Sequence, residues 1–468
     1  MPTIRFSGLA SGIDADAVIQ AMTDAKRVQS DRLELQVSER ERETDSLEEV
    51  NTRLLAVQDT LNDFLALAGG SISKRATSSN TDAVDVSVST NAPTSSTTIS
   101  SVSQLARAAT FSFDDRFTAA DEPLAPGLAG TSNITIEMGS GASQQTYDIS
   151  IDSSTTLADL ASSINETTQE SVIASVVNLG TEDNPEYTLL MNGQRSGTEE
   201  GTLNVVIPTE VTDEGIFGSY SLEQAQNAVF SIAGLGQITR QSNQVGSLIP
   251  GMNFELKSVS ASPVTITVSN DAESTADKVE AFIETFNDLH NYVDENNKVE
   301  QENLDESNTI NIFGSLAKTR TDDQAINDIK NALASSFSNV DGSPVQVFPD
   351  IGITTARDGS LDFDRAKFVT SVSEDPLAVN SLLTDFSEDV AKTGGIISNY
   401  TQFNGLIDLA VRSNDTEIEN INEKIERIEK SIQSEEDRLR LVFTNLESTT
   451  SRLNSGAQAL AGILAGIG

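Results

Sequence analysis

The C-terminal part of the chain carries an apolar repeat that few folds can accommodate. Between residues 401 and 468, aliphatic residues recur at steps of three and four positions, and Glu435 interrupts the series once. This is the a/d spacing of a coiled coil, and it predicts one long helix with a narrow apolar stripe. Such a stripe has to be covered by another helix. Its members are Ile418, Ile421, Ile425, Ile428, Ile432, Leu439, Val442 and Leu446.

A second stripe near the N-terminus offers a partner for the first. Asp14 is a suitable N-cap for a helix that starts near Ala15, and Gly69-Gly70 is a suitable end for it. We expect the two stripes to pair into a helical stalk that also provides contacts between copies of the chain. Isoleucine at both a and d favours more than two strands, although that rule is for parallel coiled coils. In the alternative, the two helices pack separately on a globular core. The second stripe consists of Leu47, Val50, Leu54, Val57, Leu61 and Phe64.

The residues between the two stripes are rich in strand patterns. Val84, Val86 and Val88 alternate with polar residues, which is the period of a half-buried strand, and the same alternation recurs at 264–268. Helical spacing returns only in shorter segments, at 157–164 behind Thr156, from Ser274 onwards, at 326–337 and after Asp375-Pro376. Together these patterns predict an α+β multidomain protein with antiparallel β-rich head domains on a helical coiled-coil stalk.

The expected domain boundaries follow the changes in pattern. Residues 1–45 form a flexible N-terminal leg segment and residues 46–70 form the N-terminal stalk helix. Residues 71–110 and 226–400 form a β/α domain next to the stalk, and residues 111–225 form one or more variable β-rich outer domains. Residues 401–468 complete the stalk and end in a second flexible leg.

The composition excludes several classes of function. With 71 acidic and 30 basic residues, the net charge is −41, which disfavours binding to nucleic acid or to an anionic membrane. Cysteine is absent and His290 is the sole histidine, so disulfides and most nucleophilic constellations are excluded. We expect no catalytic site, no cofactor, no metal and no membrane insertion, because the longest apolar run is too short to span a bilayer. The charge also suggests a saline habitat.

Several segments, in the right order, resemble one protein family. The segment 6–14, Phe-Ser-Gly-Leu-Ala-Ser-Gly-Ile-Asp, resembles the N-terminal signature of the bacterial flagellar filament cap proteins, also called flagellar hook-associated protein 2. Segments 102–106, 228–235, 249–252 and 351–355 are similar to later blocks of that family, whereas 111–225 matches only loosely. The chain departs from the family at Gln29, where proline is common, so we expect the helix to continue there.

The resemblance implies a ring-shaped homo-oligomer, most often a pentamer, at the distal tip of the flagellum. There it would prevent the loss of exported flagellin and promote its folding and polymerisation. It implies flagellin, hook–filament junction proteins and the flagellar type III export machinery as partners, in agreement with an N-terminus that lacks the pattern of a cleaved signal peptide. Two alternatives stay open: a tip-exposed adhesin that binds mucus or a host surface through 111–225, and a hook–filament junction protein, against which the block 234–251 argues.

Overall fold

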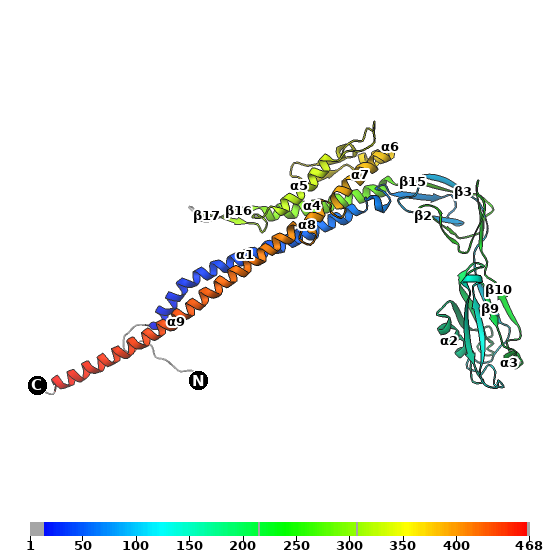
Figure 1. Cartoon of the computed structure of the whole chain (residues 1–468), viewed down its shortest axis with the longest axis horizontal. Coiled ribbons are helices and arrows are strands. Elements are labelled where there is room, and N and C mark those ends of the chain that lie inside the picture. The colour runs from blue at the N-terminus through cyan, green and yellow to red at the C-terminus, as the bar shows by residue number, and fades with distance from the viewer. Residues whose placement is uncertain (1–13, 214–215, 306–307, 466–468) are drawn as a thin grey trace. The chain divides into compact units, whose positions relative to one another are not determined.

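The structure, a computed structural model, describes residues 14–213, 216–305 and 308–465 (Figure 1). The chain splits into two compact units: unit 1 is Met1–Leu67 with Thr275–Gly468, and unit 2 is Ala68–Ser274. Helices dominate unit 1, and antiparallel sheets dominate unit 2. The predicted α+β multidomain class is therefore confirmed.

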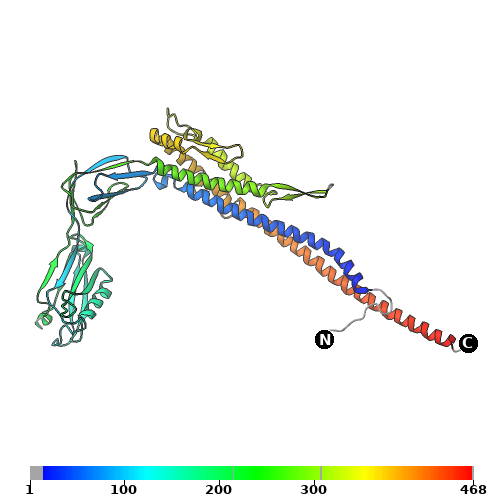
Figure 2. The same ribbon diagram turned by 180° about the vertical axis from the view of Figure 1, so that it is seen from behind.

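Unit 1 combines two very long helices with a set of shorter ones and two small antiparallel hairpins. Figures 1 and 2 both show the first and last helices of the chain side by side. The elements are α1 (Ala15–Asn62), most of α4 (Ala272–Asn297), β16 (Val299–Asp305), β17 (Asn308–Phe313), α5 (Thr321–Ser335), β18 (Ile353–Thr355), β19 (Leu361–Phe363), α6 (Arg365–Glu374), α7 (Pro376–Ala391), α8 (Ile396–Thr401) and α9 (Leu406–Ala465).

Local signals set the ends of α1. The side chain of Asp14 accepts a hydrogen bond from the backbone N–H of Ala17 at 3.1 Å, which confirms the predicted N-cap. The helix continues unbroken through Gln29, as expected. It ends at Asn62, ahead of Gly69-Gly70, so the predicted end was wrong. The N–H of buried Phe64 turns back to the carbonyl of Leu61 at 3.0 Å, and this turn stops the helix before the glycines are reached.

The shorter helices of unit 1 enclose an aromatic core. Phe386 on α7 meets Phe282 of α4 and Phe348 edge-on, with ring centroids 5.7 Å and 5.1 Å apart. Tyr400 on α8 is buried, and its hydroxyl donates a hydrogen bond to the carboxylate of Asp328 on α5. Helix α1 contacts both α7 and α8, so one of its faces packs against this core.

Unit 2 contains a first β module, made of residues 68–106 and 226–274. Its five-stranded sheet has the order β1-β15-β3-β11-β12, and its three-stranded sheet has the order β13-β14-β2. Every ladder is antiparallel, and inward-facing residues such as Phe230, Phe254 and Ile266 form one core. The strands are β1 (Lys74–Ser78), β2 (Val84–Val88), β3 (Ser95–Gln104), β11 (Ala228–Ile232), β12 (Gly236–Arg240), β13 (Gln244–Ile249), β14 (Met252–Leu256) and β15 (Val264–Asn270).

The second β module of unit 2, residues 107–225, has a core of its own around Phe111, Ile136 and Leu160. A capping box starts its helix, because Thr156 and Asp159 each accept a hydrogen bond from the other's backbone N–H at 3.1 Å. Its sheets have the orders β10-β4-β8-β7 and β6-β5-β9. The elements are β4 (Ala108–Phe113), β5 (Ser132–Met138), β6 (Gln145–Ile151), α2 (Leu157–Thr168), β7 (Val172–Asn178), β8 (Tyr187–Ser196), β9 (Leu203–Val206), α3 (Thr209–Thr212) and β10 (Tyr220–Glu223).

The observed division differs from the expected domain boundaries in two places. We expected residues 226–400 to belong with 71–110, but 275–400 belong to unit 1. The reason is that α4, α5 and α7 each present an apolar face that packs among the helices of unit 1. We also expected a boundary near residue 45, whereas α1 crosses it as one helix. Residues 1–13 of the expected leg lie outside the described residues.

Candidate assembly interface on the terminal helices

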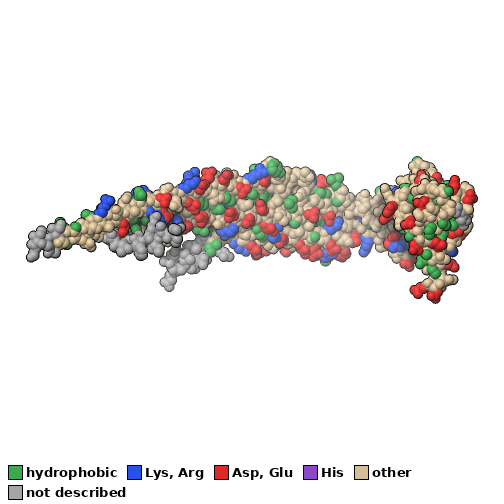
Figure 3. Space-filling model, turned by 90° about the horizontal axis from the view of Figure 1, so that it is seen from below, with side chains coloured by type: hydrophobic (Ala, Val, Ile, Leu, Met, Phe, Trp, Pro, Cys, Tyr) green, Lys and Arg blue, Asp and Glu red, His purple; other side chains and the backbone are tan. Residues whose placement is uncertain are grey.

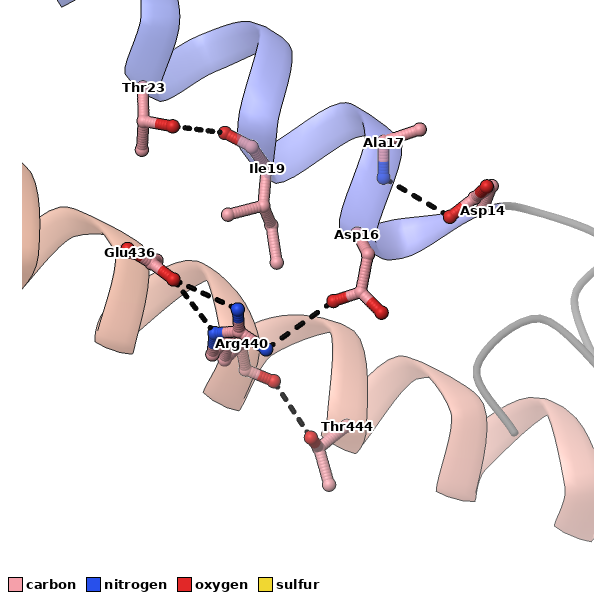
Figure 4. A network of polar contacts seen from close by, with 8 residues as sticks. All are labelled: Asp14, Asp16, Ala17, Ile19, Thr23, Glu436, Arg440 and Thr444. Atoms are coloured by element: carbon pink, nitrogen blue, oxygen red, sulfur yellow. Dashed lines mark hydrogen bonds and ion pairs between the residues drawn. The ribbon is translucent and has the colours of Figure 1, made fainter. Parts of the chain in front are cut away.

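Helices α1 and α9 pair in antiparallel fashion, and polar contacts fix their register. Arg440 on α9 contacts Asp16 at the start of α1, with 3.3 Å between Nη1 and Oδ1 (Figure 4). Further along, Arg40 Nε lies 3.1 Å from Glu417 Oε2. Asn414 then donates to the hydroxyl of Thr44 at 3.4 Å. As residue numbers rise along α1, those of its partners on α9 fall.

The apolar contribution to this pairing is one-sided. Helix α9 supplies Ile421, Ile432 and Leu439 as buried residues, and Ile418, Ile425 and Ile428 as half-buried ones. On the facing half of α1, the buried residues are mostly small or polar. These are Ala15, Ile19, Thr23, Ser30, Glu43 and Ser46. The seam between the helices is therefore an isoleucine row set against short side chains.

The N-terminal stripe also has neighbours other than α9. Its members from Leu47 to Phe64 are all buried, but the polar contacts around Leu54 and Leu61 lead to other helices. Gln58 donates to the carbonyl of Ala391 on α7 at 2.6 Å, and Arg53 pairs with Asp288 of α4. The second half of this stripe thus lies beside α4 and α7, while the isoleucine row of α9 lies along α1 residues between Asp16 and Thr44.

This facing half of α1 was not predicted as an interface, because its inward side chains give almost no apolar signal. The available clues were weak: Leu33 and Val37 are four positions apart and half-buried, and Ile19 stands four positions before Thr23. The hydroxyl of Thr23 donates a hydrogen bond to the carbonyl oxygen of Ile19 at 3.1 Å (Figure 4). This bond within α1 allows a polar side chain to be buried between the two helices.

Beyond Arg440, the apolar stripe of α9 continues and stays exposed among the described residues. Val442 is 50% exposed and Leu446 is 42% exposed, so these two predicted interface residues are not buried here. Leu453 and Leu460 extend the same row and are also exposed. With Ile432, Leu439 and Leu446 they keep strict seven-residue spacing, which is the repeat that coiled coils bury.

Electrostatics contribute little to holding the two helices together. Figure 3 shows carboxylates spread over both units on the face in view. The ion pairs of α1 and α9 are largely exposed, and such pairs are worth about 0–1 kcal/mol each. Hydrogen bonding from Arg438 lowers the pKa of Glu435, which explains how a charged residue is tolerated where the apolar series is interrupted.

Other candidate sites show structural roles. His290 is half-buried, and its Nε2 lies 2.9 Å from the carbonyl oxygen of Asp358 in the β18–β19 turn. Within the part of the chain that the structure describes, no cluster of three or more His, Asp or Glu side chains is arranged to bind a metal ion. Among these described residues, no helix has the length and apolarity needed to cross a membrane.

Two family models match the chain at either end of its sequence. Residues 11–109 match the model described as flagellar hook-associated protein 2 N-terminus, and residues 225–455 match the model for its C-terminus. Together they cover well over half of the chain. The stretch between them corresponds to the segment that resembled the family only loosely.

Curated relatives and a solved structure agree with these matches. B-type flagellar hook-associated protein 2 of Pseudomonas aeruginosa is 25% identical over 373 residues, covering 74% of this chain and 74% of the relative. Flagellar hook-associated protein 2 of Salmonella typhimurium is 23% identical over 350 residues, covering 71% and 72%. The D1-D2-D3 domains of the flagellar cap protein FliD from Escherichia coli match in fold with a TM-score of 0.60 at 21% identity, covering 79% of this chain and 99% of that one.

Proposed function

Because the chain belongs to the flagellar hook-associated protein 2 family and is thus a cap protein of the bacterial flagellar filament, we propose that it works at the filament tip as a ring of identical copies. Its relatives are structural proteins of the flagellum, and the comparisons favour neither the adhesin nor the junction-protein alternative over the cap role.

One observation supports the assembly proposal more than any other. The apolar row of α9 runs on in register past the end of α1, so that Val442, Leu446 and Leu453 are exposed in the single chain. Exposed apolar rows of this kind mark surfaces that bind protein. In the proposed cap, this end of α9 contacts neighbouring copies or filament subunits, and unit 2 forms the outward-facing plate.

The finer details of the proposal come from the resemblance. The ring is most simply a pentamer, and it keeps exported flagellin from escaping while promoting its folding and polymerisation. In this proposal the cap binds to hook–filament junction proteins. The flagellar type III machinery exports the chain without a cleaved signal peptide. A chain without cysteine has no disulfide that would resist unfolding during export.

The test is a gene deletion in the bacterium that encodes the chain, followed by complementation. We expect the deletion strain to stop swimming and to shed monomeric flagellin into the medium, and the wild-type gene to reverse both effects. Ile425→Asp places a carboxylate in the α1/α9 seam and should fail to complement, whereas Ser434→Asp, on an exposed position of the same helix, should succeed. A deletion strain that swims normally and sheds no flagellin would overturn the proposed function.

A further inference from the structure

A groove opens between α1 and α9 beside Ile428 of the isoleucine row. Its volume is about 510 Å³, and its apolar lining residues are Leu33 and Ile428. Gln29, Gln36 and Ser431 add polar lining. Ser30, next to Gln29, is buried, and its hydroxyl has no hydrogen-bond partner among the described groups.

All the charged residues that line this groove are cations. They are Arg32 on α1 and Lys424 and Arg427 on α9. Arg427 lies 3.8 Å from Glu423, and both side chains are well exposed, so this pair engages the guanidinium only weakly. No carboxylate lines the groove, although acidic residues outnumber basic ones 71 to 30 in the chain. We call this feature, defined by Leu33, Ile428, Arg32, Lys424 and Arg427, the basic groove.

The local positive charge can act despite the net charge of the whole molecule. At physiological ionic strength the Debye length is about 8 Å, so carboxylates further away are largely screened from a ligand in the groove. Glu423 and Glu426 lie beside Arg427 and are not screened from it, but the charged side chains that line the groove itself are the three cations.

The isoleucine row provides a second reason to expect an occupant. Of the isoleucine row, Ile425 and Ile428 stay half-buried beside α1, so part of their apolar surface is open to another side chain. A third helix laid against Leu33 and Ile428 would complete the packing. Helices that bind in such grooves present aliphatic anchors at spacings of three and four residues.

We propose that the basic groove is a docking site for an acidic amphipathic helix of a partner protein. The helix inserts aliphatic side chains between Leu33 and Ile428 and places carboxylates against Arg32, Lys424 and Arg427. A second copy of this chain fits less well, because its exposed helical end, α9 beyond Arg440, carries nearly balanced charge, with Glu447 and Arg452. The proposal goes beyond the cap function, because it concerns the chemistry of one partner.

The test uses the purified full-length chain and a labelled synthetic peptide of about 18 residues, enough for about five helical turns. The peptide carries leucine on one face and glutamate on the other, and a matched peptide carries lysine in place of glutamate. We expect fluorescence anisotropy to show binding of the glutamate peptide only. Lys424→Glu and Arg32→Glu should each weaken it by about tenfold, the size expected for reversing one close charge.

Two further variants separate the groove from general electrostatics. Lys430→Glu makes the same charge change on an exposed part of α9 that does not line the groove, and it should change binding by less than about twofold. Ser431→Phe fills the groove without changing its charge and should abolish binding. Far-UV circular dichroism checks that each variant keeps its helices.

Several outcomes would overturn the proposal. They are no binding of the glutamate peptide, equal binding of the lysine peptide, or equal losses in Lys424→Glu and Lys430→Glu. Self-association of the chain that is lost in Ser431→Phe would identify a second copy as the occupant instead. Because the assay uses purified protein, its result is distinguishable from that of the motility experiment.

Discussion

One side-chain substitution can measure how strongly α1 and α9 are held together. Ile421 on α9 is 4% exposed, and Ile421→Ala removes three carbon atoms from the seam. At about 0.8 kcal/mol per buried carbon group, the change costs about 2.4 kcal/mol. Collapse of the seam or entry of water limits any additional cavity penalty, because only two helices meet there. The facing half of α1 should then separate from α9 about 50 times more often.

Hydrogen exchange followed by mass spectrometry on the full chain detects this opening directly. Peptides from residues 15–43 should exchange about 50-fold faster in Ile421→Ala, because their amides are released when the helices separate. Peptides from β3 and β15 in unit 2 report on a different core and should not change. The matched control is Leu453→Ala on the same helix, where the leucine is 68% exposed and its loss should have little effect.

An acceleration of less than about fivefold in Ile421→Ala would contradict this expectation. That result would mean that the seam contributes little and that α1 is held by the globular part of unit 1 alone. Equal acceleration in Leu453→Ala would also refute it, because the exposed row would then be as important to the pairing as the buried one.

Two further predictions concern the globular part of unit 1. Phe386→Ala removes a ring that is 1% exposed and should lower the stability of this part by about 3–5 kcal/mol in urea unfolding, whereas Phe337→Ala, at an exposed position, should be nearly neutral. Burial raises the pKa of Asp322, so its charged form costs stability once the pH exceeds the unfolded pKa, near 4. Asp322→Asn should therefore raise the urea midpoint at pH 7, with a gain that shrinks as the pH falls toward 4; a gain that grows on acidification would contradict the burial argument.

Features set by neighbouring residues were predictable from the sequence. The caps at Asp14 and Thr156 follow from hydrogen bonds that span three residues, and the strands at 84–88 and 264–268 follow from alternation within a few positions. Asp375-Pro376 also starts a helix as predicted, with Asp375 accepting from the N–H of Ala378. In each case the information lies within one short segment.

The partners of these elements were not predictable from the same patterns. Periodicity shows that Leu54 and Leu61 occupy a buried face, but it does not show which helices bury them. The facing half of α1 was missed because Thr23 and Ser30 carry no apolar signal, and the β16–β17 hairpin was missed because its sequence is largely polar. The α1/α9 pairing depends on segments that are distant in the chain, which a local pattern cannot encode, whereas the hairpin joins neighbouring strands that lack an apolar alternation.

The antiparallel pairing of α1 with α9 also dictates an order of folding. The Asp16–Arg440 contact joins residues 424 positions apart, and closing so long a loop costs about 5 kcal/mol while the intervening chain is unfolded. Unit 2 is a continuous stretch of sequence, and its own folding shortens the effective loop before the ends meet. Because synthesis proceeds from the N-terminus, α1 is made first, and α9, with which it pairs, is made last. The pairing of α1 with α9 is therefore the last part of the fold to form. It is also the first to be lost when either helix is shortened.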